Sequence, residues 1–463
     1  MACVTSVSFE VLVNGGKSAQ VKPSRGLRQG DPLSSYLFIL GQEVLSRMIE
    51  QEFQRKNING VKASINGPAI THIMYDDDIV LFSKATRKDA TAINEWIIKY
   101  CKWSGQNLNR SKSGIFFSKQ TLQQSARAIK QILQMKKLMS DAIYLGALLF
   151  LTRSPKKDFN YLLNKLEGRL AGWRTMSLSW AGRCTLINSV TQTTPIYTMS
   201  SFKVPNSICN KLDALFRKFW WKPKKPTGKF LALKSWDKLC TPKDKRGPGF
   251  KKVRDSNSAL LAKLAWMIAS KWDSLCMSIL RAKYKAKEGW LHENISKHSS
   301  PIWRAIEEVK SIIVKGACYL IGDGASINVW QDPWVPWIDG FRPKPKTQDD
   351  PRNPLMVSHL MDQETRVWKD NLIQNIFDAK SLKAILSILI SLRPKPDKLI
   401  WVHNPKGNFT VKSAFQTLID QHLLPINSDV DWKKIWKIKA PERVKMLIWR
   451  IGANILPTNE NLQ

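Results

Sequence analysis

The chain has 463 residues, 43% of them hydrophobic, which excludes a disordered protein and leaves room for about two to four cored domains. Lys and Arg number 73 against 37 Asp and Glu, and the formal net charge of +36 indicates a polyanionic partner. The 19 Trp, 17 Phe and 8 Tyr residues favour nucleic acid, on whose bases they can stack, over the alternatives of acidic lipid or another protein.

The cysteine pattern and the hydropathy pattern exclude further classes. The seven cysteines are scattered, odd in number and without a Cys-x-x-Cys pair, so they predict neither disulfides nor a zinc site. No signal peptide opens the chain, and the longest uncharged apolar run, residues 384–392, is too short to span a bilayer. We therefore expect an intracellular protein, in the nucleus or cytoplasm, that is neither secreted nor bound to a membrane.

Residues 7–49 predict a hairpin followed by a helix. Two roughly alternating runs, 7–13 and 18–22, flank Asn14-Gly15-Gly16, whose residues tolerate the positive φ of a tight turn. Asp31 then offers an N-cap with Pro32 at the first helical position, and an apolar stripe continues to Ile49. This helix would hold the preceding turn, residues 28–30, in place. An ordinary capped core helix is the alternative.

Residues 69–82 place Asp76, Asp77 and Asp78 between two short apolar runs, which predicts a hairpin that presents carboxylates. Three adjacent carboxylates repel one another, so they need water, a basic neighbour or a divalent cation. A plain solvated turn is the alternative. An amphipathic helix is expected next, over residues 86–103, and the sequence of strand, hairpin and helix indicates an α+β domain.

Beyond about residue 151 the pattern becomes helical, at residues 159–170 and 182–221, and rich in Trp and basic residues. Residues 203–254 contain 16 basic and 3 acidic side chains, which makes this stretch the best candidate for binding a phosphate backbone. A solvated basic linker is the alternative, because the stretch also holds prolines and glycines. We expect the nucleic-acid contacts at Lys222, Lys224, Lys225 and Lys229.

The remaining chain predicts one long helix, residues 259–285, and then a turn at Gly322-Asp323-Gly324. A proline-rich connection, residues 339–354, suggests a boundary, and a last module opens near residue 408.

Six stretches together resemble plant LINE-type (non-LTR) retrotransposon reverse transcriptases. They are RGLRQGDPLS (25–34), YDDD (75–78), GQNLNRSKSGIFFS (105–118), YLGALL (144–149), LAGWRTMSLSWAGR (170–183) and GDGASINVWQDPW (322–334). The resemblance covers nearly the whole chain. It implies an α+β fold, with a partial polymerase palm over residues 1–150 and a mainly helical remainder: a basic thumb-like region (151–258), a Trp-rich connection (259–345) and a C-terminal module (346–463).

The resemblance also implies site residues for RNA-directed DNA synthesis, with an RNA template and DNA as partners. The aspartates of Y-x-D-D correspond to Asp77 and Asp78, which would be catalytic and would bind Mg²⁺. Lys112 would donate a proton to the leaving pyrophosphate. Two departures concern this site: Asp76 stands where these elements usually have alanine, and Ser35 where they have proline. The residues expected to line the incoming nucleotide are Arg28, Gln29, Gly30 and Tyr75.

We expect two parts of the family pattern to be missing from this chain. The first catalytic aspartate lies well upstream of RGLRQGDPLS, and only 24 residues precede Arg25 here, so we expect an N-terminally truncated and catalytically incomplete polymerase. A non-catalytic, nucleic-acid-binding relic of the element is the alternative. Residues 436–450 resemble the segment before a Cys/His zinc-binding region, and we expect the chain to end before that region and to bind no zinc.

Overall fold

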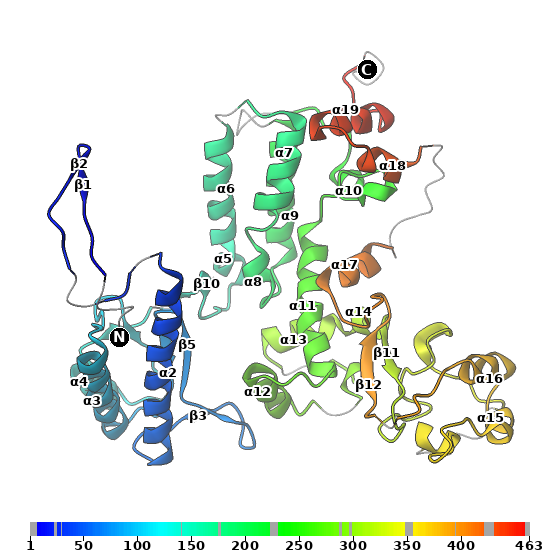
Figure 1. Cartoon of the computed structure of the whole chain (residues 1–463), viewed down its shortest axis with the longest axis horizontal. Helices are drawn as coiled ribbons and strands as arrows, with labels where there is room; N and C mark the ends of the chain where they lie inside the picture. The colour runs from blue at the N-terminus through cyan, green and yellow to red at the C-terminus, as the bar shows by residue number, and fades with distance from the viewer. Residues whose placement is uncertain are drawn as a thin grey trace. The chain divides into compact units, whose positions relative to one another are not determined.

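The computed structural model describes residues 7–22, 26–28, 30–139, 141–174, 177–222, 230–286, 289–295, 299–347, 355–393, 395–420 and 430–458. The chain divides into two compact units, residues 1–150 and 151–463. The first unit combines short strand pairs with three helices of eleven or more residues, and the second is mainly helical (Figure 1). The predicted mixture of helices and strands is confirmed, with small sheets that are antiparallel except for one parallel pair.

The first unit opens with the predicted hairpin. Strands β1 (Leu12–Val13) and β2 (Gly16–Lys17) pair antiparallel, and a bridge between Phe9 and Val21 extends the ladder. Asn14 (φ 50°) and Gly15 (φ 85°) form the turn, as their tolerance of positive φ predicts. The hairpin projects from the rest of the unit (Figure 1), and Leu12 is 71% exposed.

Helix α2 (Pro32–Gln54) begins where the sequence predicts. The Asp31 carboxylate accepts the Leu33 N–H at 2.9 Å, and proline occupies the first turn. The predicted apolar stripe is only partly buried, however. Leu45 and Ile49 enter the core of the unit, whereas Leu40, nearer the start of the helix, stays 64% exposed. The core therefore covers the C-terminal half of α2.

Two longer helices complete this core. Helix α3 (Arg87–Ser104) starts at Thr86, whose hydroxyl accepts the Asp89 N–H at 3.1 Å, and it buries Trp96 and Tyr100 as predicted. Helix α4 (Gln123–Leu133) packs beside it. The strands form separate pairs instead of one continuous sheet in the described part of this unit. These pairs are β3 (Val61–Lys62) with β4 (Ala69–Ile70), β5 (His72–Tyr75) with β6 (Asp78–Leu81), β7 (Gly114–Ile115) with β8 (Lys136–Lys137), and β9 (Ile143–Tyr144) with β10 (Ala147–Leu148).

An aromatic core, centred on Trp220, organises the first part of the second unit. Trp220 is fully buried and lies edge-on to Trp180 (4.8 Å between ring centroids) and Phe250 (5.1 Å). Its elements are α5 (Pro155–Asp158), α6 (Asn160–Arg174), α7 (Trp180–Leu186), a π-turn (Ile187–Thr191), α8 (Ile196–Met199), α9 (Asn206–Trp221), α10 (Trp236–Leu239) and a 3₁₀ turn (Lys243–Lys245).

The C-terminal helices join this same aromatic core. Helices α18 (Trp432–Lys437) and α19 (Glu442–Gly452) contribute Trp432 and Trp449 to it. The Trp449 indole N–H donates to the Arg246 carbonyl at 3.0 Å, 203 residues earlier in the chain. The last part of the chain is therefore tied to the region that follows α10.

A second core surrounds α11 (Val253–Ala269). The sequence predicted a single helix over residues 259–285, but the structure has two, because Lys271 adopts φ 53° and ends the first; α12 (Leu275–Tyr284) then starts at its Ser274 cap. Trp266 and Trp401 are buried in this core. Its other elements are a 3₁₀ turn (Trp290–His292), α13 (Pro301–Glu308), α14 (Lys310–Val314), β11 (Ala317–Leu320), β12 (Lys398–Trp401) and α17 (Val411–Asp420).

A third core forms around Trp334 and Phe377. The predicted turn at residues 322–324 borders it, and the Asp397 carboxylate braces that turn by accepting the N–H groups of Gly322 (2.7 Å) and Gly324 (3.0 Å). The helical elements here are two 3₁₀ turns (Asp339–Phe341 and Val357–Leu360), α15 (Asp370–Ile376) and α16 (Ala379–Leu386). Across all the described residues, no helix combines the length and apolar character that a membrane span requires.

Removing apolar volume from the aromatic core should destabilise the second unit. Leu166 on α6 is fully buried, and Leu166→Ala should lower the free energy of unfolding by about 2–5 kcal/mol through lost burial and a residual cavity. Leu389→Ala is the matched control, because that side chain is 95% exposed and should change stability by less than about 0.5 kcal/mol. Urea unfolding followed by Trp fluorescence compares the two; equal effects would contradict the assignment of this core.

Candidate active site and basic surface

The hairpin β5–β6 places the three aspartates at one exposed tip. Tyr75 pairs with Asp78 across the ladder, and Asp76 and Asp77 form the two-residue turn between them. All three carboxylates are exposed, and Tyr75 is 64% exposed. The predicted hairpin that presents carboxylates is therefore confirmed. Asp76 adopts φ 51°, a left-handed conformation that Asp tolerates better than most residues.

The base of this hairpin is fixed to helix α2. His72 Nε2 lies 2.8 Å from Ser46 Oγ on α2, and His72 Nδ1 lies 2.9 Å from Thr71 Oγ1. Burial lowers the pKa of His72 despite the opposing effect of Glu50 and Glu43, so the ring is neutral near pH 7. A rigid base with an exposed tip lets the carboxylates reach a ligand in solution.

The predicted nucleotide-binding turn precedes α2. Arg28 is exposed, and Gly30 has φ 83°, a conformation that favours glycine and leaves the backbone accessible. Gln29 lies outside the described residues. Within the described chain, no hydrogen bond or ion pair joins Arg28 or Gly30 to the hairpin tip, and the expected closeness of turn and tip remains a prediction.

Lys112 lies in the turn before β7 with its side chain exposed. Its N–H donates to Asn109 Oδ1 at 3.2 Å, which shapes this turn. Arg110, two residues earlier, fixes the loop to both long helices: its guanidinium donates to Asn94 Oδ1 on α3 (3.2 Å) and to the Leu133 carbonyl at the end of α4. Our sequence reasoning gave Arg110 no role. Its signal was a second basic residue in the same loop as Lys112.

Carboxylate oxygens are the ligands that Mg²⁺ prefers, and Asp77 and Asp78 supply two carboxylates at one tip. In the part of the chain that the structure describes, no group of three or more His, Cys, Asp or Glu side chains is placed to hold a metal ion. The described residues therefore fit part of a Mg²⁺ site.

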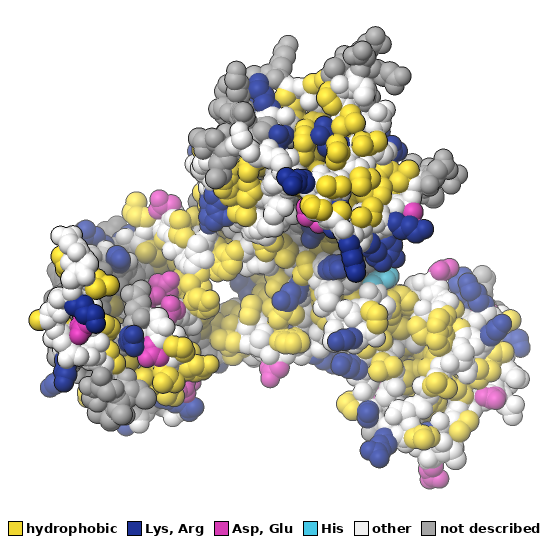
Figure 2. Space-filling model, turned by 45° about the horizontal axis from the view of Figure 1, so that its top comes forward, with side chains coloured by type: hydrophobic (Ala, Val, Ile, Leu, Met, Phe, Trp, Pro, Cys, Tyr) yellow, Lys and Arg dark blue, Asp and Glu magenta, His cyan; other side chains and the backbone are white. Residues whose placement is uncertain are grey.

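The basic stretch, residues 203–254, includes α9 and continues beyond its end. Lys222 follows Trp221, is half-buried, and donates its backbone N–H to the Lys218 carbonyl at 2.8 Å. The other three predicted contacts, Lys224, Lys225 and Lys229, lie outside the described residues. Burial, with Arg246 and Lys238 nearby, lowers the pKa of Lys234 to about 8. The sequence did not single out Lys234. On the face shown in Figure 2, basic side chains clearly outnumber acidic ones.

Comparison with known proteins relates the first part of the chain to a family of polymerases. Residues 2–162 match the family described as reverse transcriptase (RNA-dependent DNA polymerase). The chain is 30% identical over 321 residues to a putative ribonuclease H protein of Arabidopsis thaliana, which aligns 66% of this chain with 50% of that protein. The chain thus spans half the length of that relative.

Two shorter plant relatives are covered almost completely. One uncharacterized mitochondrial protein of Arabidopsis thaliana is 32% identical over 142 residues, which make up 92% of its length and 30% of this chain. A second is 37% identical over 109 residues, 86% of its length and 23% of this chain. The match over residues 2–162 therefore places a reverse-transcriptase domain in the first part of this chain. The relatives named here are plant proteins.

The comparisons also correct the expectation about zinc. Residues 409–463 match the family described as zinc-binding in reverse transcriptase, so the prediction that the chain ends before this region was wrong, as was the exclusion of zinc. The matched segment holds one histidine, His422, outside the described residues, and no cysteine. Its described part, which includes α18 and α19, has no metal-binding group of three or more ligands. These described residues do not form a zinc centre by themselves.

The strained turn position provides a test of the hairpin geometry. Asp76→Gly should raise the free energy of local hairpin opening by about 0.5–1 kcal/mol, because glycine adopts φ 51° without a steric cost. Asp76→Val should lower the same free energy by about 1 kcal/mol or more, since a β-branched residue disfavours this conformation. Amide hydrogen exchange at Ile79 and Val80 on β6 measures both changes. Identical exchange in the two variants would show that Asp76 does not hold positive φ.

Proposed function

We propose that this chain is the polymerase part of a LINE-type (non-LTR) retrotransposon reverse transcriptase, which acts on an RNA template and DNA. The observation that carries the proposal is the exposed Tyr75-to-Asp78 hairpin, held at its base by α2, within a segment that matches the reverse-transcriptase family. The motif order along the rest of the chain supports the LINE type. This chain spans half the length of its longer relative, so the activity of the whole element is also part of this proposal.

In this proposal each site residue has a stated role. Asp77 and Asp78 are the catalytic carboxylates and would hold Mg²⁺, which when bound lowers the pKa of the primer 3′-hydroxyl and neutralises triphosphate charge. Tyr75, Arg28, Gln29 and Gly30 line the incoming nucleotide. Lys112 is exposed and free of a described acidic partner, so it can donate a proton to the leaving pyrophosphate.

The catalytic state follows from the number of carboxylates. A two-metal site uses carboxylates from adjacent strands, and one exposed hairpin tip offers only part of that set. Asp76 does not supply the missing group, because it belongs to the same turn as Asp77. We infer that the described residues form an incomplete polymerase site.

The alternative is a non-catalytic relic that binds nucleic acid, which the basic excess favours. Phosphate neutralisation by Lys and Arg releases counterions and needs no catalytic carboxylate. We assign this role to the thumb-like region, residues 151–258, through Lys222, Lys224, Lys225 and Lys229. The palm (1–150), connection (259–345) and C-terminal module (346–463) complete the proposed division of the chain.

Primer extension tests the catalytic proposal. The purified chain should give no detectable extension of a primed RNA template with Mg²⁺ or Mn²⁺, because two carboxylates neither position nor activate a primer hydroxyl. A reverse transcriptase of known activity serves as the positive control. Extension that disappears in Asp77→Ala but persists in Asp76→Ala would overturn the inferred incompleteness and would establish Asp77 as catalytic.

Salt-dependent binding tests the basic surface. The fourfold variant Lys222→Glu, Lys224→Glu, Lys225→Glu and Lys229→Glu should bind duplex and single-stranded probes more weakly. It should also flatten the slope of log affinity against log salt by about 3.6 for duplex DNA, from four lost phosphate contacts. Its matched control reverses four lysines near the third core, Lys344, Lys346, Lys380 and Lys383. If both variants lost binding equally, the net charge of the chain, and not this stretch, would determine affinity.

A further inference from the structure

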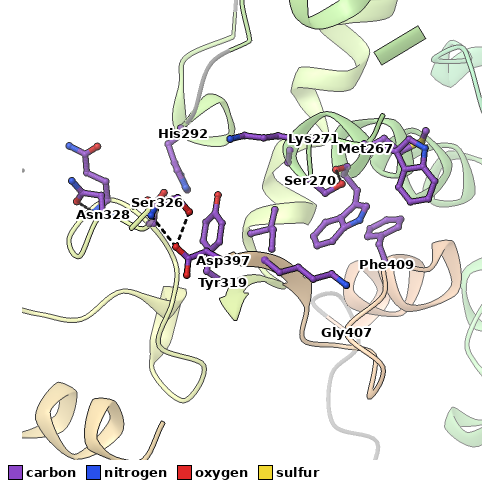
Figure 3. Close-up of a pocket in the computed structure, with 18 of the residues that line it drawn as sticks. Met267, Ser270, Lys271, His292, Tyr319, Ser326, Asn328, Asp397, Gly407 and Phe409 are labelled. Atoms are coloured by element: carbon purple, nitrogen blue, oxygen red, sulfur yellow. Dashed lines mark hydrogen bonds between the residues drawn. The ribbon is translucent and has the colours of Figure 1, made fainter. Parts of the chain in front are cut away.

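A cleft of about 1130 Å³ lies within the second unit, and none of the site residues discussed so far lines it. The end of α11, the 3₁₀ turn at His292, strand β11, the loop at residues 326–332 and the segment from β12 to Phe409 line it. Figure 3 shows Lys271 and His292 on one side of this cleft, with Tyr319 and Asp397 facing them. Phe409 lies below Met267 and Ser270 in the same view. Its volume slightly exceeds the roughly 300–1,000 Å³ of a small-molecule pocket.

The charged lining of the cleft is effectively basic. Its cationic side chains outnumber its two carboxylates, and both carboxylates are engaged in bracing loops. Asp397 accepts the N–H and hydroxyl of Ser326 (3.0 and 2.9 Å) as well as the N–H groups of the 322–324 turn. Asp332 accepts the Asn328 N–H at 2.8 Å. The cationic side chains of the lining are Lys263, Lys271, Arg342 and Lys398.

Two buried donors in the lining have no acceptor. Arg342 Nε and Trp330 Nε1 are both buried, and neither has a hydrogen-bond partner among the described residues. A buried donor without an acceptor is unfavourable, so such groups call for an explanation in a bound ligand or water. The pKa of His292 is lowered by burial and by the positive charges of Arg342 and Lys310, which agrees with a positive potential in the cleft. An anionic ligand would complement this potential.

Aromatic rings lie beside the cations. The side chain of Trp272 is 58% exposed. Its backbone is fixed, because the backbone N–H donates to the Met267 carbonyl (2.9 Å) and the backbone carbonyl accepts from the Arg281 guanidinium (3.1 Å). Tyr319 is half-buried in the lining. Phe409 stacks on Trp266 with ring centroids 5.5 Å apart. Exposed or half-buried rings among lysines provide stacking surfaces for bases next to contacts for phosphates.

We propose that this cleft binds a single-stranded polynucleotide, with bases stacked on Trp272 and Tyr319 and phosphates contacted by Lys263, Lys398 and Arg342. Stacking on these rings requires unpaired bases, which a duplex does not offer. The lysines extend the positive surface along the cleft, which suits a strand better than a single small anion. The site is independent of the hairpin and of residues 222–229, so it stands whether or not the chain polymerises DNA.

Equilibrium binding of labelled oligo(U), oligo(dT) and a duplex, each of about 20 nucleotides per strand, tests this site. Trp272→Ala should weaken single-strand binding about tenfold and leave duplex binding unchanged. Lys263→Glu with Lys398→Glu should flatten the single-strand salt slope by about 1.4, from two lost phosphate contacts. The matched controls are Trp337→Ala, at a ring 60% exposed outside the cleft, and Lys315→Glu with Lys380→Glu.

Two outcomes would overturn the proposal. One is unchanged single-strand affinity in Trp272→Ala together with an unchanged salt slope in the lysine variant. The other is an equal loss of single-strand and duplex binding, which would indicate a general effect of charge or folding. Photo-crosslinking of 4-thiouridine-labelled RNA to the unaltered chain gives a second readout, and the expected cross-linked peptides contain Trp272, Tyr319 or Phe409.

Discussion

Electrostatic repulsion among basic side chains is the constraint under which this chain folds. Almost twice as many Lys and Arg as Asp and Glu must be accommodated, and the described carboxylates are largely engaged in helix caps, loop braces and a few ion pairs such as Lys252 with Asp237 (2.8 Å). Arg183 and Arg450 lie close enough that each guanidinium is 4.4 Å from the centroid of the Trp180 ring. Burial lowers the pKa of Arg183, and repulsion by Arg450 lowers it further.

The aromatic cores offset this repulsion. Indole rings bury a large apolar area and also attract cations to their faces, so one Trp can stabilise both the core and the basic residues around it. Trp180 shows both effects, since it packs against Trp220 and contacts two guanidinium groups. The basic surface and the Trp content thus depend on each other. Either a polyanion or a Trp-rich core reduces the cost of bringing these cations together.

Local signals in the sequence predicted much of the first unit. Asn14-Gly15 defined a hairpin turn, Asp31-Pro32 a helix start, and the apolar runs around Asp77 a strand pair, because each depends on residues only a few positions apart. The candidate active site could be predicted from the sequence for the same reason. The break at Lys271 was missed, since nothing there has the glycine that usually ends a helix. Burial of only half the α2 stripe reflects tertiary packing, which periodicity does not report.

Local signals predicted neither the cleft in the second unit nor the match of the C-terminal residues to a zinc-binding family. The cleft's lining comes from segments between Lys263 and Phe409 that meet only in the folded chain, so no local pattern announces it. Zinc was excluded on cysteine spacing, a local criterion, whereas the match over residues 409–463 rests on the pattern of the whole segment. Residue-by-residue prediction therefore misses sites that form only when distant segments meet, and families that are defined by the pattern of a whole segment.

The tie between Trp449 and Arg246 has a consequence for the order of folding during synthesis. The two residues are 203 positions apart, and the Lys234 ammonium reaches the Ala453 carbonyl across 219 positions (3.4 Å). Closing a loop of that length costs entropy, and on the ribosome it must also wait until α19 has emerged. The apolar surface of α7 and α9 that α19 covers is therefore exposed while about 200 further residues are made. During translation this surface is where a chaperone would be needed.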